Sequence, residues 1–178
     1  MEEKIIEQNN DFKEKKCYKV KVIIVGNAGV GKTNILYRLV NKEFMSQYQA
    51  TIAVDFLVYT VEFAERIFKL VLMDTAGCEA FRSIRRGYYT NCSFAIIVYD
   101  ITDQDSFNGV KDWINDCKNY ANENIHMVLV GNKIDLGETR KISTEEGTEL
   151  ANEYNMDFFE CSAKTGENIE SIFSRWGR

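Results

Sequence analysis

The sequence lacks several features that would point to other classes of protein. No apolar run approaches the roughly 18 residues needed to cross a bilayer. The opening residues, 1–16, are polar and acidic where a signal peptide would be apolar, which argues against export. The formal net charge is −5, and this acidic balance argues against nucleic acid as a partner, because phosphate contacts require clustered Lys and Arg.

Cysteine and histidine are too few and too scattered to build a metal site or a disulfide framework. The five cysteines show no metal-like pairing: Cys17, Cys78, Cys92, Cys117 and Cys161. An odd number of cysteines without a secretion signal fits a reducing cytosol, so we expect free thiols that are mostly buried. His126 is the only histidine and is predicted to be structural.

The chain begins with a polar segment and continues as one domain. Its length of 178 residues suffices for a single domain with a sizeable core. Residues 1–17 are rich in Glu, Lys and Asn, and we expect them to be disordered because they have little to bury. The alternative is an amphipathic helix that binds a partner through Ile5, Ile6 and Phe12. Residues 18–178 are expected to form the domain.

Apolar runs typical of strands alternate with helical segments along this domain. Strands are predicted at Val20–Val25, Val54–Phe63, Arg66–Met73, Phe94–Tyr99, Met127–Val130 and Asp157–Cys161. A helix is predicted from Lys32 to about Lys42, and another over Asn168–Trp176 from its stripe of Ile169, Ile172, Phe173 and Trp176. The spacing that starts a helix occurs twice, in Thr102 with Asp105 and in Ser143 with Glu146.

The alternation predicts the fold class. Strands that alternate with helices imply a largely parallel sheet with helices on both faces. The short link between Val54–Phe63 and Arg66–Met73 predicts an antiparallel pair. The expected fold is therefore α/β, with a six-stranded, mostly parallel sheet and one antiparallel strand. Ligands of such sheets bind beyond the carboxyl ends of the strands.

The first predicted strand ends in a phosphate-binding loop. Residues 26–33 read Gly-Asn-Ala-Gly-Val-Gly-Lys-Thr, which fits G-x-x-x-x-G-K-[ST] between a strand and a helix. The glycines let successive N–H groups point at a phosphate, and the helix adds its positive end. Lys32 can bridge the outer phosphates and Thr33 can bind Mg²⁺. The alternative is a glycine-rich turn. The nucleotide-binding residues predicted here are Asn27, Ala28, Gly29, Val30, Gly31, Lys32, Thr33 and Asn34.

A second loop, Asp74-Thr75-Ala76-Gly77, follows the third predicted strand. Asp74 can reach Mg²⁺ through a water, and Gly77 lets its N–H approach the terminal phosphate closely. Such a tetrapeptide alone is mostly a turn, but the phosphate loop upstream favours a function.

Residues at the ends of the last two predicted strands favour guanine over adenine through their polar side chains and one backbone N–H. They are Asn132, Lys133, Asp135, Ser162, Ala163 and Lys164. Guanine offers N1–H and an amino group side by side, so the Asp135 carboxylate can accept both bonds. Adenine would leave that carboxylate unpaired, which can discriminate by about 10⁴ or more. Asn132 can bond to the ring and to the phosphate loop, the Lys133 stem can lie along the ring, and the Ala163 N–H can donate to the guanine carbonyl.

These motifs resemble those of the Ras superfamily of small GTPases from Tyr18 to about Trp176. The Rab branch is the most similar, because Thr51–Phe56 resembles its switch signature, and Phe81–Ile84 and Tyr88-Tyr89 occur where that branch has them. The resemblance implies a P-loop GTPase fold that binds GTP or GDP with Mg²⁺. It also implies a role in vesicle traffic through effector proteins, exchange factors and GTPase-activating proteins.

The same resemblance assigns further residues. Thr51 is expected to bind Mg²⁺ and the terminal phosphate only with GTP. Phe44 is expected to stack near the guanine, and Tyr48 to flank the phosphates. The catalytic positions of the family correspond to Lys32, Gly77 and Cys78.

That last position departs from the family pattern. The family has Gln where this chain has Cys78, and the glutamine orients the attacking water. Cysteine is shorter than glutamine and forms only weak hydrogen bonds, so we predict slow intrinsic hydrolysis of GTP. A harmless substitution is the milder alternative. A guanine-nucleotide-binding scaffold that scarcely hydrolyses is a competing function, and an ATP-dependent small-molecule kinase is a third that would need an additional acceptor domain.

Three further departures concern partners. Ala28 lies close to the expected terminal phosphate, and Ala80 replaces an arginine usual in Rabs. Met73 replaces a tryptophan, so Phe56, Met73 and Tyr88 or Tyr89 would make a softer effector patch.

The chain ends at Arg178 without the prenylated cysteines of Rab tails. We expect a truncated chain, a further domain, or a protein without lipid. The expected location is cytoplasmic, and on intracellular membranes only if a C-terminal segment is lipidated.

Overall fold

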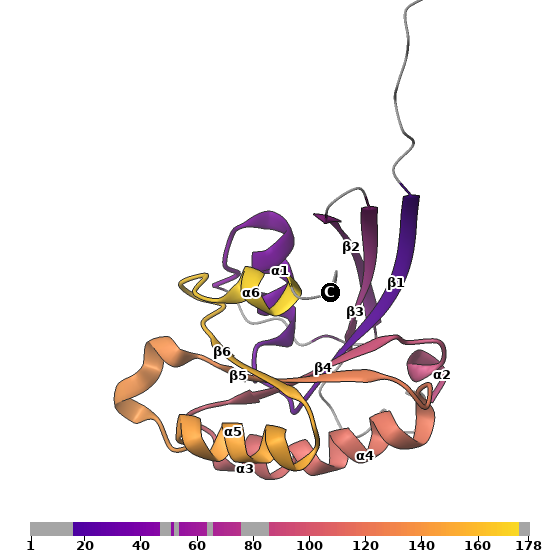
Figure 1. Ribbon diagram of the computed structural model, residues 1–178. Coiled ribbons are helices and arrows are strands. Elements are labelled where there is room, and N and C mark those ends of the chain that lie inside the picture. The colour runs from indigo at the N-terminus through magenta and orange to yellow at the C-terminus, as the bar shows by residue number, and fades with distance from the viewer. Residues whose placement is uncertain (1–15, 47–50, 52–53, 64–65, 76–85, 175–178) are drawn as a thin grey trace, which may run out of the picture.

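The computed structural model describes residues 16–46, 51, 54–63, 66–75 and 86–174. These residues form a six-stranded sheet of order β2-β3-β1-β4-β5-β6 with helices on both faces (Figure 1). The β2–β3 pair is antiparallel and the other pairs are parallel. The predicted α/β fold with one antiparallel strand is confirmed.

The strands are β1 Lys16–Val25, β2 Val54–Phe63, β3 Arg66–Thr75, β4 Phe94–Asp100, β5 His126–Asn132 and β6 Asp157–Cys161. The helices are α1 Lys32–Asn41, α2 Arg86–Tyr89, α3 Gln104–Asn108, α4 Val110–Tyr120, the 3₁₀ helix η2 Ile134–Thr139, α5 Thr144–Glu153 and α6 Ile169–Ser174. Each predicted strand is present, with bounds that differ by a few residues for most of them.

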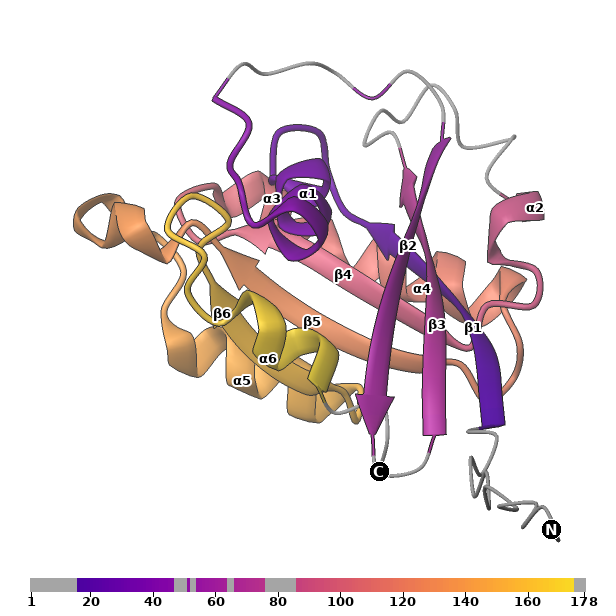
Figure 2. The same cartoon turned by 90° about the horizontal axis from the view of Figure 1, so that it is seen from above.

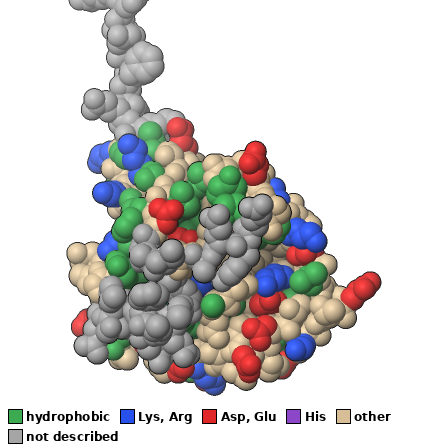
Figure 3. All heavy atoms as spheres, turned by 180° about the vertical axis from the view of Figure 1, so that it is seen from behind, with side chains coloured by type: hydrophobic (Ala, Val, Ile, Leu, Met, Phe, Trp, Pro, Cys, Tyr) green, Lys and Arg blue, Asp and Glu red, His purple; other side chains and the backbone are tan. Residues whose placement is uncertain are grey.

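β1 begins at Lys16, so Lys16 and Cys17 belong to the sheet rather than to the predicted extension. The ring of Tyr18 stacks on Phe68 of β3 at 5.4 Å, which favours pairing this far along the strand. Figure 3 shows hydrophobic side chains beside Lys and Arg side chains near the base of the N-terminal trace, where β1 starts. Residues 1–15, for which we predicted disorder, lie outside the described residues.

Two hydrophobic clusters cover the two faces of the sheet. Val22 and Ile24 point into the cluster under α1 and α6, which lie side by side in Figure 2. Ile23 and Val25 point into the opposite cluster, under α3, α4 and α5. Because both faces are covered, β1 is apolar along Val22–Val25 instead of alternating with polar residues. Among the helices in the described part of the chain, none combines the length and apolarity of a membrane span.

The predicted start of α5 is confirmed. The Ser143 hydroxyl accepts a bond from the Glu146 N–H at 3.1 Å, and the Glu146 carboxylate accepts one from the Ser143 N–H at 2.8 Å. This reciprocal pair satisfies two of the free N–H groups at the start of the helix.

The predicted cap at Thr102 is wrong. Asp103 caps α3, because its carboxylate accepts the bond from the Asp105 N–H at 3.1 Å. Thr102 instead donates its N–H and its hydroxyl to Asp100, at 2.9 and 2.8 Å. The aspartate one residue nearer to the helix therefore takes the cap, as side chains of this kind commonly do.

The last helix is shorter than predicted. α6 comprises Ile169–Ser174, and its stripe of Ile169, Ile172 and Phe173 is buried. Trp176 lies outside the described residues. Cys92, Cys117 and Cys161 are buried free thiols, as predicted for most of the cysteines, and burial raises the pKa of Cys92 to about 11. Cys17 is exposed, and Cys78 lies outside the described residues.

We expect Phe173→Ala to lower the free energy of unfolding by about 3–5 kcal/mol, because it removes a fully buried ring and leaves a cavity under α6. Denaturant unfolding of the nucleotide-saturated protein measures this change. The neighbouring Ser174→Ala removes an exposed hydroxyl and its exposed bond to the Ser171 carbonyl, and it should be nearly neutral. Equal effects of the two substitutions would contradict the packing of α6.

Candidate nucleotide-binding site

The carboxyl ends of β1, β3, β5 and β6 lead into the four predicted motifs, at one edge of the sheet. Gly26–Thr33 follows β1, and Asp74 lies at the end of β3. The segments after β5 and β6 carry the polar residues predicted to read the base. The parallel arrangement of β1, β3, β5 and β6 places all these ends on the same side.

The phosphate loop wraps around the side chain of Lys32. This lysine is buried, and its Nζ donates to the carbonyls of Gly26 and Asn27 at 2.9 and 2.8 Å. Gly26 has a φ of 143°, and a Cβ there would lie 2.2 Å from the Val98 carbonyl oxygen. Only glycine fits such an approach, so the loop's shape depends on this residue. The ammonium group is therefore held by the first two carbonyls of the loop, and a loop of this kind can present its backbone N–H groups to an anion.

Three oxygen-bearing side chains meet beside the loop. The Thr33 hydroxyl donates to Asp74 Oδ2 at 2.5 Å and lies 2.9 Å from the Thr51 hydroxyl. Thr51 in turn lies 3.4 Å from the same carboxylate oxygen. Thr33 lies in α1, Thr51 in the segment before β2, and Asp74 in β3. The sequence predicted these three residues as the metal site.

The oxygen cluster fits Mg²⁺. Asp74 is 2% exposed, and its Oδ1 has no hydrogen-bond partner among the described residues. Burial raises the pKa of this carboxyl, and the bonds from Thr33 and Thr51 and the Lys32 charge only partly oppose the rise. A buried carboxylate with an unsatisfied oxygen is costly on its own and is stabilised by a cation. Hydroxyl and carboxylate oxygens are the ligands that Mg²⁺ prefers.

The side chain of Asn132 joins the phosphate loop to the base-reading segments. Its Nδ2 donates to the Val30 carbonyl at 2.8 Å, and its Oδ1 accepts from the Ala163 N–H at 3.1 Å. Asn132 is 1% exposed, so both bonds lie away from competing water. A Cβ at Gly31 would lie 2.4 Å from the same Nδ2, which explains why this loop position is glycine.

The Asp135 carboxylate is held in place by Ser162 and Lys164. Its Oδ1 accepts a bond from the Ser162 hydroxyl at 2.6 Å, and its Oδ2 lies 3.8 Å from Lys164 Nζ. The side chain is only 13% exposed although its backbone lies at the surface. Lys133 Nζ pairs with the Asp100 carboxylate at 2.6 Å. The arrangement presents an acceptor pair suited to adjacent N–H donors.

Comparison with known proteins identifies the family. Residues 21–178 match the sequence model of the Ras family. The chain belongs to the Ras family. Ras-related protein RIC1 of Oryza sativa subsp. japonica is 46% identical over 88% of this chain and 77% of its own length. Ras-related protein Rab-3 of Caenorhabditis elegans is 41% identical over 89% of this chain and 72% of its own length. Ras-related protein RAB1BV of Beta vulgaris is 40% identical over 88% of this chain and 73% of its own length.

These relatives are Rab-type proteins, as the Thr51–Phe56 signature predicted. Proteins of the Ras family are in general GTP hydrolases that bind guanine nucleotide with Mg²⁺. The Ras-family assignment therefore agrees with the chemistry of both halves of the site.

Two predicted residues use their side chains elsewhere. The Asn27 amide faces α4, where its oxygen accepts the Trp113 indole N–H at 2.9 Å, so only its backbone can face a phosphate. The Asn34 oxygen accepts the Met45 N–H at 3.1 Å and fixes the segment that follows α1. Phe44, in that segment, is 38% exposed and therefore available for contact.

The remaining predicted residues divide into two groups. Ala28 and Gly29 are the exposed residues of the phosphate loop. Tyr48, Gly77 and Cys78 lie outside the described residues, as does Ala80.

The predicted effector patch is wrong in part. Met73 is 1% exposed and Tyr89 is 0% exposed, because both pack into the cluster under α4. Phe56, which pairs with Met73 in the β2–β3 ladder, is 57% exposed on the edge strand. Tyr88 is half-buried. An apolar contact on this face would therefore centre on Phe56, since Met73 is covered.

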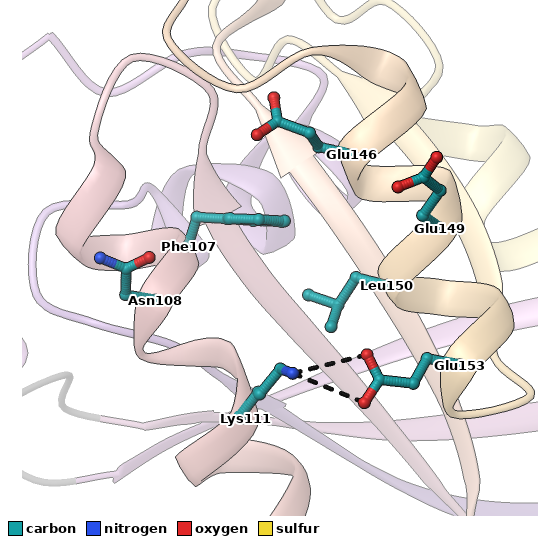
Figure 4. Close-up of a pocket in the computed structure, with 7 residues that line it drawn as sticks. All are labelled: Phe107, Asn108, Lys111, Glu146, Glu149, Leu150 and Glu153. Carbon is teal, nitrogen blue, oxygen red and sulfur yellow. Dashed lines mark hydrogen bonds and ion pairs between the residues drawn. The ribbon is translucent and has the colours of Figure 1, made fainter.

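A groove between α3–α4 and α5 contains none of the predicted site residues (Figure 4). Its volume is about 370 Å³, and Phe107 and Leu150 form its apolar part. Lys111 reaches across it to the Glu153 carboxylate at 3.4 Å. Because this ion pair is exposed, it contributes little to stability.

Sequence reasoning missed Asp100 and also Arg38, whose Nε donates to the Ala163 carbonyl at 3.0 Å. Asp100 ends β4 beside the base-reading segment, and the rule that sites gather at strand ends could have found it. Arg38 lies within α1, and no pattern in the sequence marks it.

We expect Asp74→Asn to have opposite effects with and without metal. The raised pKa means that the metal-free fold loses stability as pH rises through that pKa, and asparagine removes this loss. In the presence of GDP and a chelator the variant should melt at a higher temperature at pH 7 than the unsubstituted protein.

The same substitution should weaken Mg²⁺ binding by about 10–100-fold, because the carboxylate charge that holds the metal's shell is lost. Titration of Mg²⁺ against GDP release measures this affinity. An Mg²⁺ affinity that Asp74→Asn leaves unchanged would remove Asp74 from the metal site.

Proposed function

We propose that this Ras-family protein is a GTP/GDP switch of the Rab type with slow intrinsic hydrolysis. The supporting observation is that Asn132 bonds the phosphate loop at Val30 and the base-reading loop at Ala163. The oxygen cluster of Thr33, Thr51 and Asp74 lies at the same edge of the sheet. One ligand with phosphates at one end and guanine at the other fits both halves.

The chain's own residues divide the work of binding. The backbone N–H groups of residues 27–33 would surround the phosphates, and Lys32 would contribute its charge. Asp135 would accept the two adjacent donors of guanine, and the Ala163 N–H would donate to its carbonyl. Mg²⁺, held through Thr33, Thr51 and Asp74, supplies charge neutralisation on the phosphates.

The switch would depend on Thr51. This residue lies 2.9 Å from the Thr33 hydroxyl, in the segment between α1 and β2. With a terminal phosphate present, Thr51 would bind the phosphate and the metal, and Gly77 would approach the same group. Loss of that phosphate would release both segments.

Slow hydrolysis follows from Cys78. A thiol cannot place a carbonyl and an amide on the attacking water as the usual glutamine does. The same residue favours a second candidate function, a guanine-nucleotide-binding scaffold that remains loaded with GTP. The two proposals differ in whether bound GTP turns over at a measurable rate.

We further propose that effector proteins, an exchange factor and a GTPase-activating protein bind at the switch segments, with Phe56 as the exposed aromatic contact. A role in vesicle traffic and a cytoplasmic location follow from the Rab-type relatives. Residence on intracellular membranes would depend on a lipidated C-terminal segment.

We expect the protein to prefer GDP over ADP by about 10⁴-fold, since adenine would leave Asp135 unpaired. Asp135→Asn should lose most of the affinity for GDP and gain affinity for xanthosine diphosphate, whose carbonyl replaces the guanine amino group. Isothermal titration calorimetry measures the affinity of all three ligands for both proteins. Glu149→Gln, on the exposed face of α5, provides a control that removes a carboxylate outside the site. Equal affinity of the unsubstituted protein for GDP and ADP would refute the guanine site.

We expect Cys78→Gln to raise the rate of single-turnover GTP hydrolysis on the order of tenfold, because positioning one reactant commonly contributes at least this much. The measurement uses protein loaded with radiolabelled GTP, with nucleotide release followed on the same preparation. An unchanged or lower rate would contradict the role assigned to Cys78. GTP that stays bound for hours without turnover in the unsubstituted protein would favour the scaffold.

A further inference from the structure

The side chain of Arg38 donates to three backbone carbonyl groups. Its Nε donates to the Ala163 carbonyl at 3.0 Å, and its Nη1 donates to the Lys42 carbonyl at 2.8 Å. Its Nη2 donates to the carbonyl of Lys164. The guanidinium group therefore bridges α1, the residue that follows α1, and the loop after β6.

The carbonyl groups on one side belong to the loop that reads the base. Ala163 also donates its N–H to Asn132, and the preceding Ser162 hydroxyl donates to Asp135. A shift of this loop would move the Ala163 N–H and the group that orients Asp135 together. Arg38 bonds two carbonyls of the same loop, those of Ala163 and Lys164.

The carbonyl on the other side belongs to the start of the segment that carries Phe44. Lys42 ends α1 with a left-handed backbone, at a φ of 61°, and turns the chain out of the helix. Phe44 follows two residues later, and the Met45 N–H is held by Asn34. Arg38 and Asn34 thus both fix this segment to α1.

Arginine suits this position because of its chemistry. Its guanidinium group is planar and presents five donors in a rigid fork, so one side chain can hold several carbonyl groups in a fixed arrangement. Hydrogen bonds from a charged donor are stronger than those from a neutral one. Arg38 is half-buried, which limits competition from water.

We propose that Arg38 is a positioning residue that sets how long a guanine nucleotide stays bound. It joins the two sides of the base pocket, the loop at Ala163 and Lys164 and the segment leading to Phe44, without contacting the base. The inference rests on the proposed guanine site and adds to it a determinant of the dissociation rate. Release requires these two sides to separate, and the three bonds oppose that separation.

The experiment compares the dissociation rate of fluorescent GDP from the unsubstituted protein, Arg38→Met and Arg38→Lys. Arg38→Met keeps most of the apolar stem and removes the donors. Arg38 lines a groove of about 380 Å³ between α1 and α6, so the methionine can be accommodated. Arg38→Lys retains the charge and can replace only part of the fork.

Lys111→Met is the matched control. Lys111 is also a cation in a groove between helices, but that groove contains no residue of the nucleotide site. Single-turnover GTP hydrolysis and the acceleration of GDP release by a chelator are measured on every variant. Both report on the phosphate end, where Arg38 makes no contact that the structure describes.

We expect Arg38→Met to release GDP at least on the order of tenfold faster, because a tenfold change corresponds to about 1.4 kcal/mol and three hydrogen bonds worth about 0.5–1.5 kcal/mol net each supply at least that much. Arg38→Lys should be intermediate, and Lys111→Met unchanged. The rate of GTP hydrolysis should be the same in all four proteins. The factor by which a chelator accelerates GDP release should also be the same in all four. A general loosening of the domain would change these two phosphate-end readouts as well, and that result would overturn the proposal.

Two further outcomes separate this inference from the proposed function. If the unsubstituted protein retains fluorescent GDP and both Arg38 variants release it at the same rate, the positioning role is refuted and the guanine site stands. If the unsubstituted protein does not retain GDP in the presence of Mg²⁺, the proposed function is refuted together with this inference. Should Arg38→Met fail to fold, Arg38→Lys still decides the question.

Discussion

The nucleotide site depends on one buried amide. Asn132 takes its donor bond to the phosphate loop and its acceptor bond from the loop after β6, so a single side chain sets the spacing between the two ends of the site. It can do so because β5 lies between β4 and β6, so its carboxyl end is flanked by the segments that follow both neighbouring strands. An unpaired amide in this position would cost about 1–3 kcal/mol for each group left unsatisfied. The phosphate loop and the loop after β6 therefore stabilise each other's position through Asn132.

The close approach around Asn132 explains where glycine is required. Side chains cannot be accommodated at Gly26, where the backbone passes Val98, or at Gly31, where it passes the Asn132 amide. Gly29 has a positive φ but open space around it, so its requirement is conformational alone. The phosphate loop is thus shaped by its neighbours in the sheet as much as by its own sequence.

Local patterns predicted the features that depend on short stretches of chain. The phosphate loop, the Asp135 segment and the capping box at Ser143 each lie within a few consecutive residues, and strand alternation predicted the sheet. Predictions failed where the outcome depends on packing between distant segments. Met73 was predicted to be an exposed contact, but it is buried in the same hydrophobic cluster as Tyr89 and the apolar residues of α4. Arg38 could not be predicted, because its partner loop lies 125 residues away in the sequence.

The bonds that hold the two ends of the site differ in what could release them. At the predicted metal end, Thr33 and Thr51 bond through side chains to Asp74 Oδ2, and Oδ1 of the same carboxylate has no hydrogen-bond partner among the described residues, so the arrangement would be stabilised by a bound cation. At the base end, Asn132 and Arg38 bond to backbone carbonyls that are present in every state. Loss of a phosphate can therefore loosen the metal end while the base end keeps its geometry. This asymmetry would let the proposed switch change shape without losing its nucleotide.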